Sequence, residues 1–123
     1  MGLIYKEVEL VGQKGKKKVP ALFDIGSSQS FMRKSIAEEI TTPFKIDESL
    51  EFETASGTIR TDLVIFSRII LDGHKIFWTF IIVEDLTEEL ILGADFFQRW
   101  KIRLDPETEE IIWDPKALKL TLI

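Results

Sequence analysis

Cysteine is absent from this 123-residue chain, and histidine occurs once, at His74. Without cysteine the chain forms neither disulfides nor thiolate metal sites, and a single histidine leaves no histidine-based metal cluster. The same shortage excludes the Ser–His and Cys–His pairs that activate nucleophiles in many hydrolases. The sequence nevertheless carries 21 aspartate and glutamate residues. Carboxylate chemistry is therefore the kind of catalysis that the composition leaves open.

The chain also lacks a surplus of positive charge. It has 16 lysine and arginine residues against 21 aspartate and glutamate residues, which gives a formal net charge of −5. This balance argues against a surface built to neutralise phosphates, so we expect no nucleic-acid partner. No apolar run approaches the roughly 20 residues that cross a bilayer. The N-terminal segment reaches Lys6 and Glu7 before a signal-peptide core could form. We therefore expect a cytoplasmic protein without membrane contact.

The chain does contain the material for one folded domain over residues 1–123, because 45% of its residues are hydrophobic and 30% are charged. Strand signals dominate, so we predict a mainly β fold arranged as a small closed or partly open barrel. Two short helices are expected, one over residues 32–40 with Ser30 as its N-cap and one over residues 94–100. The predicted strands cover residues 3–11, 19–23, 50–54, 58–71, 75–83, 90–92, 102–104 and 110–113.

The first segment with a chemical signature reads Ala-Leu-Phe-Asp-Ile-Gly-Ser-Ser over residues 21–28. Asp24 follows an apolar strand, so its carboxylate is expected at the exposed end of that strand. Gly26 lets the backbone turn sharply, while Ser27 and Ser28 offer hydroxyl and amide groups that could orient the carboxylate. Taken alone, however, Asp-Xaa-Gly is more often an ordinary turn.

The second segment reads Leu-Ile-Leu-Gly-Ala-Asp-Phe-Phe over residues 90–97, an apolar strand followed by glycine and a short helix. Because Gly93 has no side chain, we expect this strand to pack closely against the loop that carries Asp24. Asp95 lies at the predicted start of the helix, where a negative charge favours the helix dipole. By itself this segment is more typical of a plain strand-to-helix corner.

In this order, with a glycine-containing hairpin at residues 53–58 between them, the two segments resemble the motifs of the retropepsin-like aspartic protease family. That family occurs in retroviruses, retrotransposons and some cellular genomes. Its first motif is two apolar residues, Asp, Thr or Ser, Gly, and Ala or Ser, which residues 22–27 match at all but one position. Its second motif is an apolar pair followed by Gly and a short helix, as found from Ile91 onward. The resemblance runs from residue 6 to residue 113 and implies an acid-protease barrel with a flap hairpin.

The resemblance also implies a mechanism and partners. Each chain of a family member supplies one catalytic aspartate, so Asp24 from two protomers of a homodimer would form the site. The substrate would be an extended peptide or protein, and neither a metal nor a cofactor is needed. The apolar ends at residues 3–5 and 118–123 would interleave between protomers. The resemblance assigns substrate binding to Gly26, Ser27, Ala55, Ser56 and Gly57, and support of the active loop to Ile25, Ser28, Leu92 and Gly93.

Ile25 is the position at which the chain departs from the family motif. The threonine or serine usual there hydrogen-bonds across the dimer, and isoleucine has no hydroxyl group with which to do so. Each lost hydrogen bond costs about 1 kcal/mol. Two functions therefore stay open: an aspartic endopeptidase, and a catalytically weak or inactive module of the same fold that binds peptides or dimerises.

Overall fold

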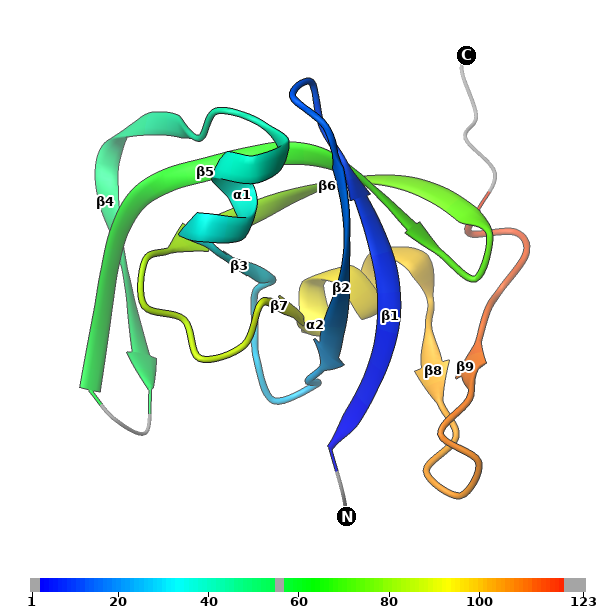
Figure 1. Cartoon of the computed structure of the whole chain (residues 1–123). Helices are drawn as coiled ribbons and strands as arrows, with labels where there is room; N and C mark the ends of the chain where they lie inside the picture. Colours follow the sequence, from blue (N-terminus) through cyan, green and yellow to red (C-terminus); the bar gives the residue numbers. More distant parts are fainter. Residues whose placement is uncertain (1–2, 55–56, 119–123) are drawn as a thin grey trace.

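The computed structural model describes residues 3–54 and 57–118 (Figure 1). Two predictions fall outside this range and stay predictions. One is substrate binding by Ala55 and Ser56, and the other is the exchange of a C-terminal strand, of which residues 119–123 form the greater part. Among the described residues, no helix combines the length and apolar character needed to span a membrane.

The chain begins with a β-hairpin of β1 (Ile4–Val11) and β2 (Lys16–Phe23). Its antiparallel register places Ile4 opposite Phe23 and Val11 opposite Lys16. In the middle of β1, Val8 and Leu10 are buried while their sequence neighbours are partly exposed, which is the alternation of a strand with one face on the core. The hairpin thus presents one apolar face to the rest of the molecule.

A closed barrel forms because β1 pairs on its second side with β5. In the described part of the chain, the main sheet has the order β1-β2-β7-β3-β6-β5-β4, so the β1–β5 pairing closes a ring of six strands and leaves β4 outside it. Closure leaves the six strands of the ring without a free sheet edge, whereas β4 pairs only with β5 in the described residues. The mainly β barrel predicted from the sequence is confirmed. The other strands of this sheet are β3 (Phe31–Arg33), β4 (Phe44–Thr54), β5 (Gly57–Leu71), β6 (His74–Val83) and β7 (Leu90–Leu92).

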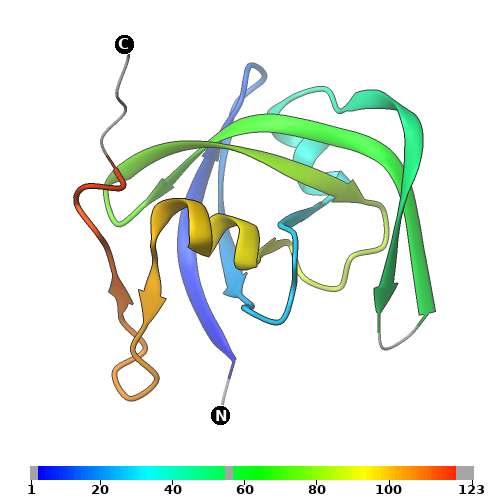
Figure 2. The same cartoon turned by 180° about the vertical axis from the view of Figure 1, so that it is seen from behind.

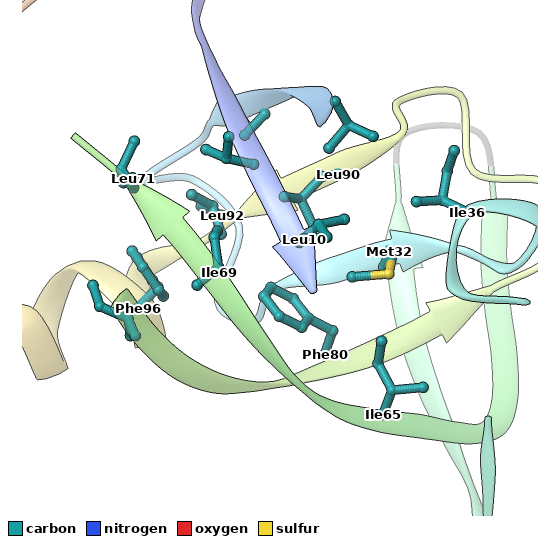
Figure 3. Close-up of a cluster of buried hydrophobic side chains, with 14 of the residues drawn as sticks. Leu10, Met32, Ile36, Ile65, Ile69, Leu71, Phe80, Leu90, Leu92 and Phe96 are labelled. Atoms are coloured by element: carbon teal, nitrogen blue, oxygen red, sulfur yellow. The ribbon is translucent and has the colours of Figure 1, made fainter. Parts of the chain in front are cut away.

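The core fills the barrel with fully buried aliphatic and aromatic side chains. Figure 3 shows Phe80 of β6 among Leu10, Met32 and Ile69 from three other strands, and all four side chains are 0% exposed. Burying one such side chain contributes roughly 1.5–3 kcal/mol to folding. The helices α1 (Lys34–Ile40) and α2 (Ala94–Trp100) add their own buried residues to this cluster.

The first helix is shorter than predicted, and the prediction that Ser30 caps it is wrong. Residues 31–33 form β3, which pairs with β6 on one side and β7 on the other, and α1 begins only at Lys34. The N-cap position is Arg33, which makes no side-chain capping bond. Pairing on both sides buries Met32 completely, so tertiary pairing outweighs the local helical pattern at these residues.

A small second sheet follows α2 and consists of β8 (Arg103–Leu104) and β9 (Ile111–Ile112), paired antiparallel. In the turn between them, the backbone amide of Glu107 donates to the carboxylate of Asp105 at 3.0 Å. This bond is the main cause that lowers the pKa of Asp105 below its ordinary value of 3.8. The turn is therefore stabilised above that pH and loses this contribution as the carboxylate is protonated in acid.

Candidate active site

Asp24 lies at the end of the barrel where β2 stops. Phe23, the last residue of β2, pairs with Leu92 of the parallel strand β7, and the amide of Asp24 donates to the carbonyl of Leu92 at 3.0 Å. The amide of Gly26 donates to Oδ1 of Asp24 at 2.9 Å. A Cβ atom on Gly26 would lie 3.1 Å from that same oxygen, which leaves little room for a side chain. The amide that orients the Asp24 carboxylate therefore belongs to Gly26, not to Ser27 or Ser28 as the sequence suggested. The Ser27 hydroxyl instead donates to the carbonyl of Gln29 at 2.7 Å, and the Ser27 amide donates to the backbone carbonyl of Asp24 at 3.1 Å.

The close approach predicted for Gly93 is present. A Cβ atom at this position would lie 2.6 Å from the carbonyl oxygen of Ser27 and would also overlap the carbonyl of Gln29. The amide of the next residue, Ala94, donates to the Ser27 carbonyl at 2.7 Å. The start of α2 is therefore hydrogen-bonded directly to the loop that carries Asp24, and fully buried Leu92 anchors the strand before it.

A cleft of about 530 Å³ opens beside Asp24. The Asp24 loop forms one side of it, and the hairpin of β4 and β5 forms the other. The views from both sides place the end of β4, the start of β5 and the loop after β2 at the same end of the barrel (Figures 1 and 2). The sequence-predicted site residues along the cleft are Asp24, Gly26, Ser27 and Ser28, and the further lining residues include Phe31, Glu51, Phe52, Glu53, Ile59, Leu86 and Ile91.

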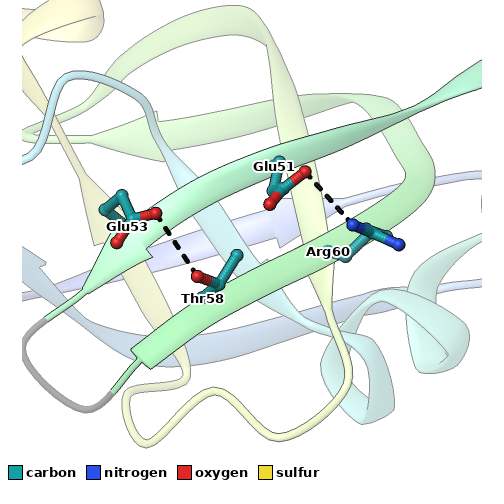
Figure 4. Close-up of polar contacts among 4 residues, drawn as sticks. All are labelled: Glu51, Glu53, Thr58 and Arg60. Atoms are coloured by element: carbon teal, nitrogen blue, oxygen red, sulfur yellow. Dashed lines mark hydrogen bonds and ion pairs between the residues drawn. The ribbon is translucent and has the colours of Figure 1, made fainter.

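Pairs of residues across the two arms hold the β4–β5 hairpin together. Figure 4 shows Glu51 facing Arg60 and Glu53 facing Thr58, at 3.2 Å and 3.3 Å. Gly57 has a φ angle of +130°, a conformation that side-chain-bearing residues rarely adopt. A glycine is thus required where β5 begins, next to the tip.

An aromatic contact joins the hairpin to the barrel. The ring of Phe52 meets the ring of Phe31 edge-on, with centroids 5.0 Å apart and planes at 89°. Such pairs contribute roughly 0.5–1.5 kcal/mol beyond the area they bury. Sequence reasoning did not assign either ring to the site. The alternating pattern at residues 50–54 was the available signal, because it gives Phe52 and Leu50 one face of the strand and the glutamates the other.

Ile25 and Ser28 are both exposed, and only Ser28 lines the Asp24 cleft. The Ile25 side chain is 69% exposed, which is unusual for an isoleucine. It borders a second hollow that Phe97 and Ile102 also line. The structure therefore does not bury Ile25 as support for the loop inside its own protomer.

The three tryptophans are absent from the set that lines the Asp24 cleft. Trp78 and Trp100 line a separate, mostly apolar groove of about 610 Å³, together with Asp95. Trp113 instead donates its Nε1 hydrogen to Asp72 at 3.0 Å. Trp78 and Trp100 therefore belong to a different surface from the cleft beside Asp24.

Metal chemistry has no obvious location within residues 3–54 and 57–118. No group of three or more histidine, aspartate or glutamate side chains there is arranged to hold an ion. The cleft offers one oriented carboxylate, that of Asp24, in a lining that combines apolar side chains with Glu51 and Glu53.

Comparisons of the sequence and the fold with known proteins both find aspartyl proteases or protease-like domains. Residues 11–99 match the model of a family described as "gag-polyprotein putative aspartyl protease". The retroviral protease-like domain of Ddi1 from Leishmania major is 21% identical, with a TM-score of 0.63 over 93% of this chain and 89% of that one. EIAV protease in complex with the inhibitor HBY-793 is 16% identical, with a TM-score of 0.67 over 85% of this chain and 93% of that one. No curated protein matches the sequence.

Proposed function

The chain belongs to the gag-polyprotein aspartyl protease family, and from this membership we propose that it is a homodimeric aspartic endopeptidase. The observation that carries the proposal is the Asp24 carboxylate, oriented by the Gly26 amide at 2.9 Å and placed on the wall of a cleft of about 530 Å³. An extended peptide would lie in this cleft between the Asp24 loop and the β4–β5 hairpin. Its backbone would add to the hairpin as a further strand.

The proposed reaction uses one Asp24 from each protomer. Two carboxylates held a few ångströms apart cannot both ionise easily, so they share one proton. The ionised carboxylate takes a proton from a water molecule as that water attacks the scissile carbonyl carbon. The protonated carboxyl group donates a hydrogen bond to the carbonyl oxygen and stabilises the tetrahedral intermediate. Collapse of the intermediate returns a proton to the leaving amine.

Exposed apolar side chains support dimerisation at the Asp24 end of the barrel. Figures 1 and 2 both place the start of β1, the loop after β2 and the β8–β9 hairpin at this end. Leu3, Tyr5, Ile25 and Ile112, which belong to these three segments, are between 41% and 69% exposed. Covering such side chains with a second copy would remove apolar surface from water and bring the two Asp24 loops together.

The test is to incubate the purified protein with a diverse peptide pool between about pH 4 and pH 7, the range in which a shared proton is plausible. Mass spectrometry should find cleavage products that disappear when a pepstatin-type inhibitor is added. Analytical ultracentrifugation of the same sample should find a dimer. Cleavage that persists with the inhibitor, or no cleavage at any pH, contradicts the proposal.

A second function has one specific observation in its favour, namely the exposed isoleucine at position 25. Without a hydroxyl group there, two facing loops lack the hydrogen bonds that fix them in the family to which this chain is similar. A folded dimer that binds peptides and cleaves them slowly or not at all would result. Peptides that bind the purified protein but remain intact would favour this module.

Replacing Ile25 with threonine distinguishes the two functions. Two new hydrogen bonds of about 1 kcal/mol each would raise kcat/KM for peptide cleavage by roughly tenfold or more. Ile25→Val is the matched control, because valine has nearly the shape of threonine but no hydroxyl group. Equal activities of the threonine and valine variants in a fluorogenic-peptide assay would show that the hydroxyl group does not limit this enzyme.

The charges along the cleft lead to a prediction about substrates. Asp24, Glu51 and Glu53 line it, and its described lining includes no lysine or arginine. Arg60 pairs with Glu51 at 3.2 Å, so the prediction rests on Glu53 and Asp24. We expect peptides with a basic residue near the scissile bond to be cleaved faster than isosteric neutral ones. Glu53→Gln should lower kcat/KM for the basic peptides alone, by about two- to fivefold, since exposed ion pairs contribute up to about 1 kcal/mol.

The control for this substrate prediction is Glu48→Gln, which removes an exposed carboxylate from the same strand but outside the cleft. It should leave the preference unchanged. Paired peptides that differ only in lysine against norleucine would measure the ratio. An unaltered ratio in Glu53→Gln would rule out Glu53 as a determinant of specificity.

A further inference from the structure

We propose that Asp95 is the positioning residue that fixes the Asp24 loop within a single protomer, acting through Ser30 and held in place by Trp78. The inference deepens the proposed function and rests on it, because the loop matters through Asp24. Asp95 itself touches neither the Asp24 cleft nor the reacting atoms. It lines the separate groove to which Trp78 and Trp100 also belong.

Both oxygens of the Asp95 carboxylate are engaged. The hydroxyl group of Ser30 donates to Oδ1 at 2.8 Å, and the indole Nε1 of Trp78 donates to Oδ2 at 3.2 Å. The Trp78 ring cannot move freely, because it meets the rings of Phe96 and Trp100 at centroid distances of 5.5 Å and 6.2 Å. Ser30 and the restrained Trp78 ring thus fix the two oxygens of the Asp95 carboxylate.

Ser30 connects Asp95 to the loop through hydrogen bonds of its side chain. Its side chain is buried, with only 1% of the residue exposed, and its Oγ accepts a hydrogen bond from the amide of Gly93 at 3.0 Å. Its backbone carbonyl accepts from the amide of Ile81 at 3.0 Å. Hydrogen bonds that are shielded from water in this way are stronger than exposed ones and polarise one another. Ser30 therefore joins the end of the loop, the start of α2 and β6.

The chain of bonds ends at the catalytic segment. Gly93 and Ala94 lie directly against the loop, and the Ala94 amide bonds the Ser27 carbonyl at 2.7 Å. The Asp24 amide donates a hydrogen bond to the carbonyl of Leu92 at 3.0 Å. Leu92 is the residue directly before Gly93 in the sequence. Trp78, Asp95 and Ser30 thus constrain the same short stretch of backbone that sets the direction of the Asp24 carboxylate.

This arrangement explains how the loop keeps its shape with isoleucine at position 25. Ile25 is 69% exposed and has no polar side-chain atom, so it contributes no hydrogen bond to a neighbouring loop. The hydrogen bonds from Trp78 through Asp95 and Ser30 to Gly93 constrain the loop from within one protomer. The Asp24 carboxylate is therefore oriented before the dimer forms. A group that is already oriented needs less rearrangement to reach the transition state.

Amide hydrogen exchange measured by NMR on the full chain tests the proposal without relying on activity. Asp95→Leu should speed exchange of the Gly93 and Ala94 amides at least tenfold and leave the β5–β6 amides unchanged. Trp78→Phe keeps most of the ring packing and removes only the donor, so it should shift the same loop signals by a smaller amount. Trp113→Phe is the matched control, because it breaks a comparable Trp-to-Asp bond elsewhere and should leave the loop unchanged.

Asp95→Asn provides the rescue. The asparagine carbonyl can accept from Trp78 while its amide donates to Ser30, so both contacts survive with one hydrogen bond reversed. Slow exchange should return in this variant, and kcat should recover with KM unchanged throughout the series. Loop protection that is unchanged in Asp95→Leu, or lost equally across the barrel, would overturn the proposal. If the wild-type protein cleaves no peptide, the exchange results alone decide this inference, so its failure and that of the proposed function remain distinguishable.

Discussion

Asp24→Asn should lower kcat/KM for peptide cleavage by about 10³-fold while the protein stays folded. Asparagine has no ionisable carboxylate, so it cannot take the proton from the attacking water, and general acid–base catalysis contributes roughly 10²–10⁴-fold. The loop should keep its shape, because the side-chain oxygen of asparagine can accept the same hydrogen bond from the Gly26 amide. The measurement is steady-state cleavage of a fluorogenic peptide, accompanied by thermal unfolding.

The control is Asp62→Asn, which removes a carboxylate on β5 that lies 3.7 Å from Lys45 and outside the cleft. Its activity should match the wild type. A mixed dimer of one wild-type protomer and one Asp24→Asn protomer adds a second check, because a shared site predicts loss of activity after a single substitution. If Asp24→Asn retains its activity, Asp24 serves only as a turn residue and the proposed chemistry is wrong.

Gly93→Ala should destabilise the fold by about 3 kcal/mol or more and lower Tm by roughly 10 °C. A Cβ atom there would lie 2.6 Å from the Ser27 carbonyl oxygen, far inside contact distance, and would also strike the carbonyl of Gln29. Both groups are backbone atoms, so no side chain can rotate away. Either the loop moves and misdirects Asp24, or α2 moves and loses its hydrogen bond to Ser27.

Gly15→Ala is the matched control for this effect. A Cβ atom at position 15 would meet only the carbonyl oxygen of Glu39, at an ordinary distance of 3.7 Å. Its free energy of unfolding in urea should stay within about 0.5 kcal/mol of the wild type. If the two variants prove equally stable, the loop and α2 are not packed as closely as described.

The general architecture follows from local patterns in the chain. Alternating apolar residues predict the strands because side chains of a strand point to opposite faces, and a half-buried sheet keeps one face apolar. The close packing at Gly93 could also be predicted from the sequence, because a glycine between an apolar strand and a helix allows another backbone to come into contact. Asp24 stood out because a charged residue follows directly after the buried end of β2.

Other features depend on residues far apart in the chain and could not be read locally. Ser30 resembles a helix cap in sequence, yet its hydroxyl group bonds Asp95, 65 positions away. Asp95 resembles a residue that favours the helix dipole, and its position in the first turn of α2 agrees with that, but its carboxylate also bonds Trp78. The Phe31–Phe52 contact that joins the hairpin to the barrel is likewise a pairing between separate strands.

By itself the sequence determined the class of fold, the order of its two motifs and the identity of the oriented carboxylate, because each depends on neighbouring residues. Only the tertiary structure decided that Phe31–Arg33 forms a strand, that the exposed Ile25 side chain lies outside the core, and that Ser30, Trp78 and Asp95 meet behind the loop. The physical reason is closure of the barrel. Pairing and burial between distant strands outweigh local propensity, and they bring together polar groups whose partners have no fixed spacing in the sequence.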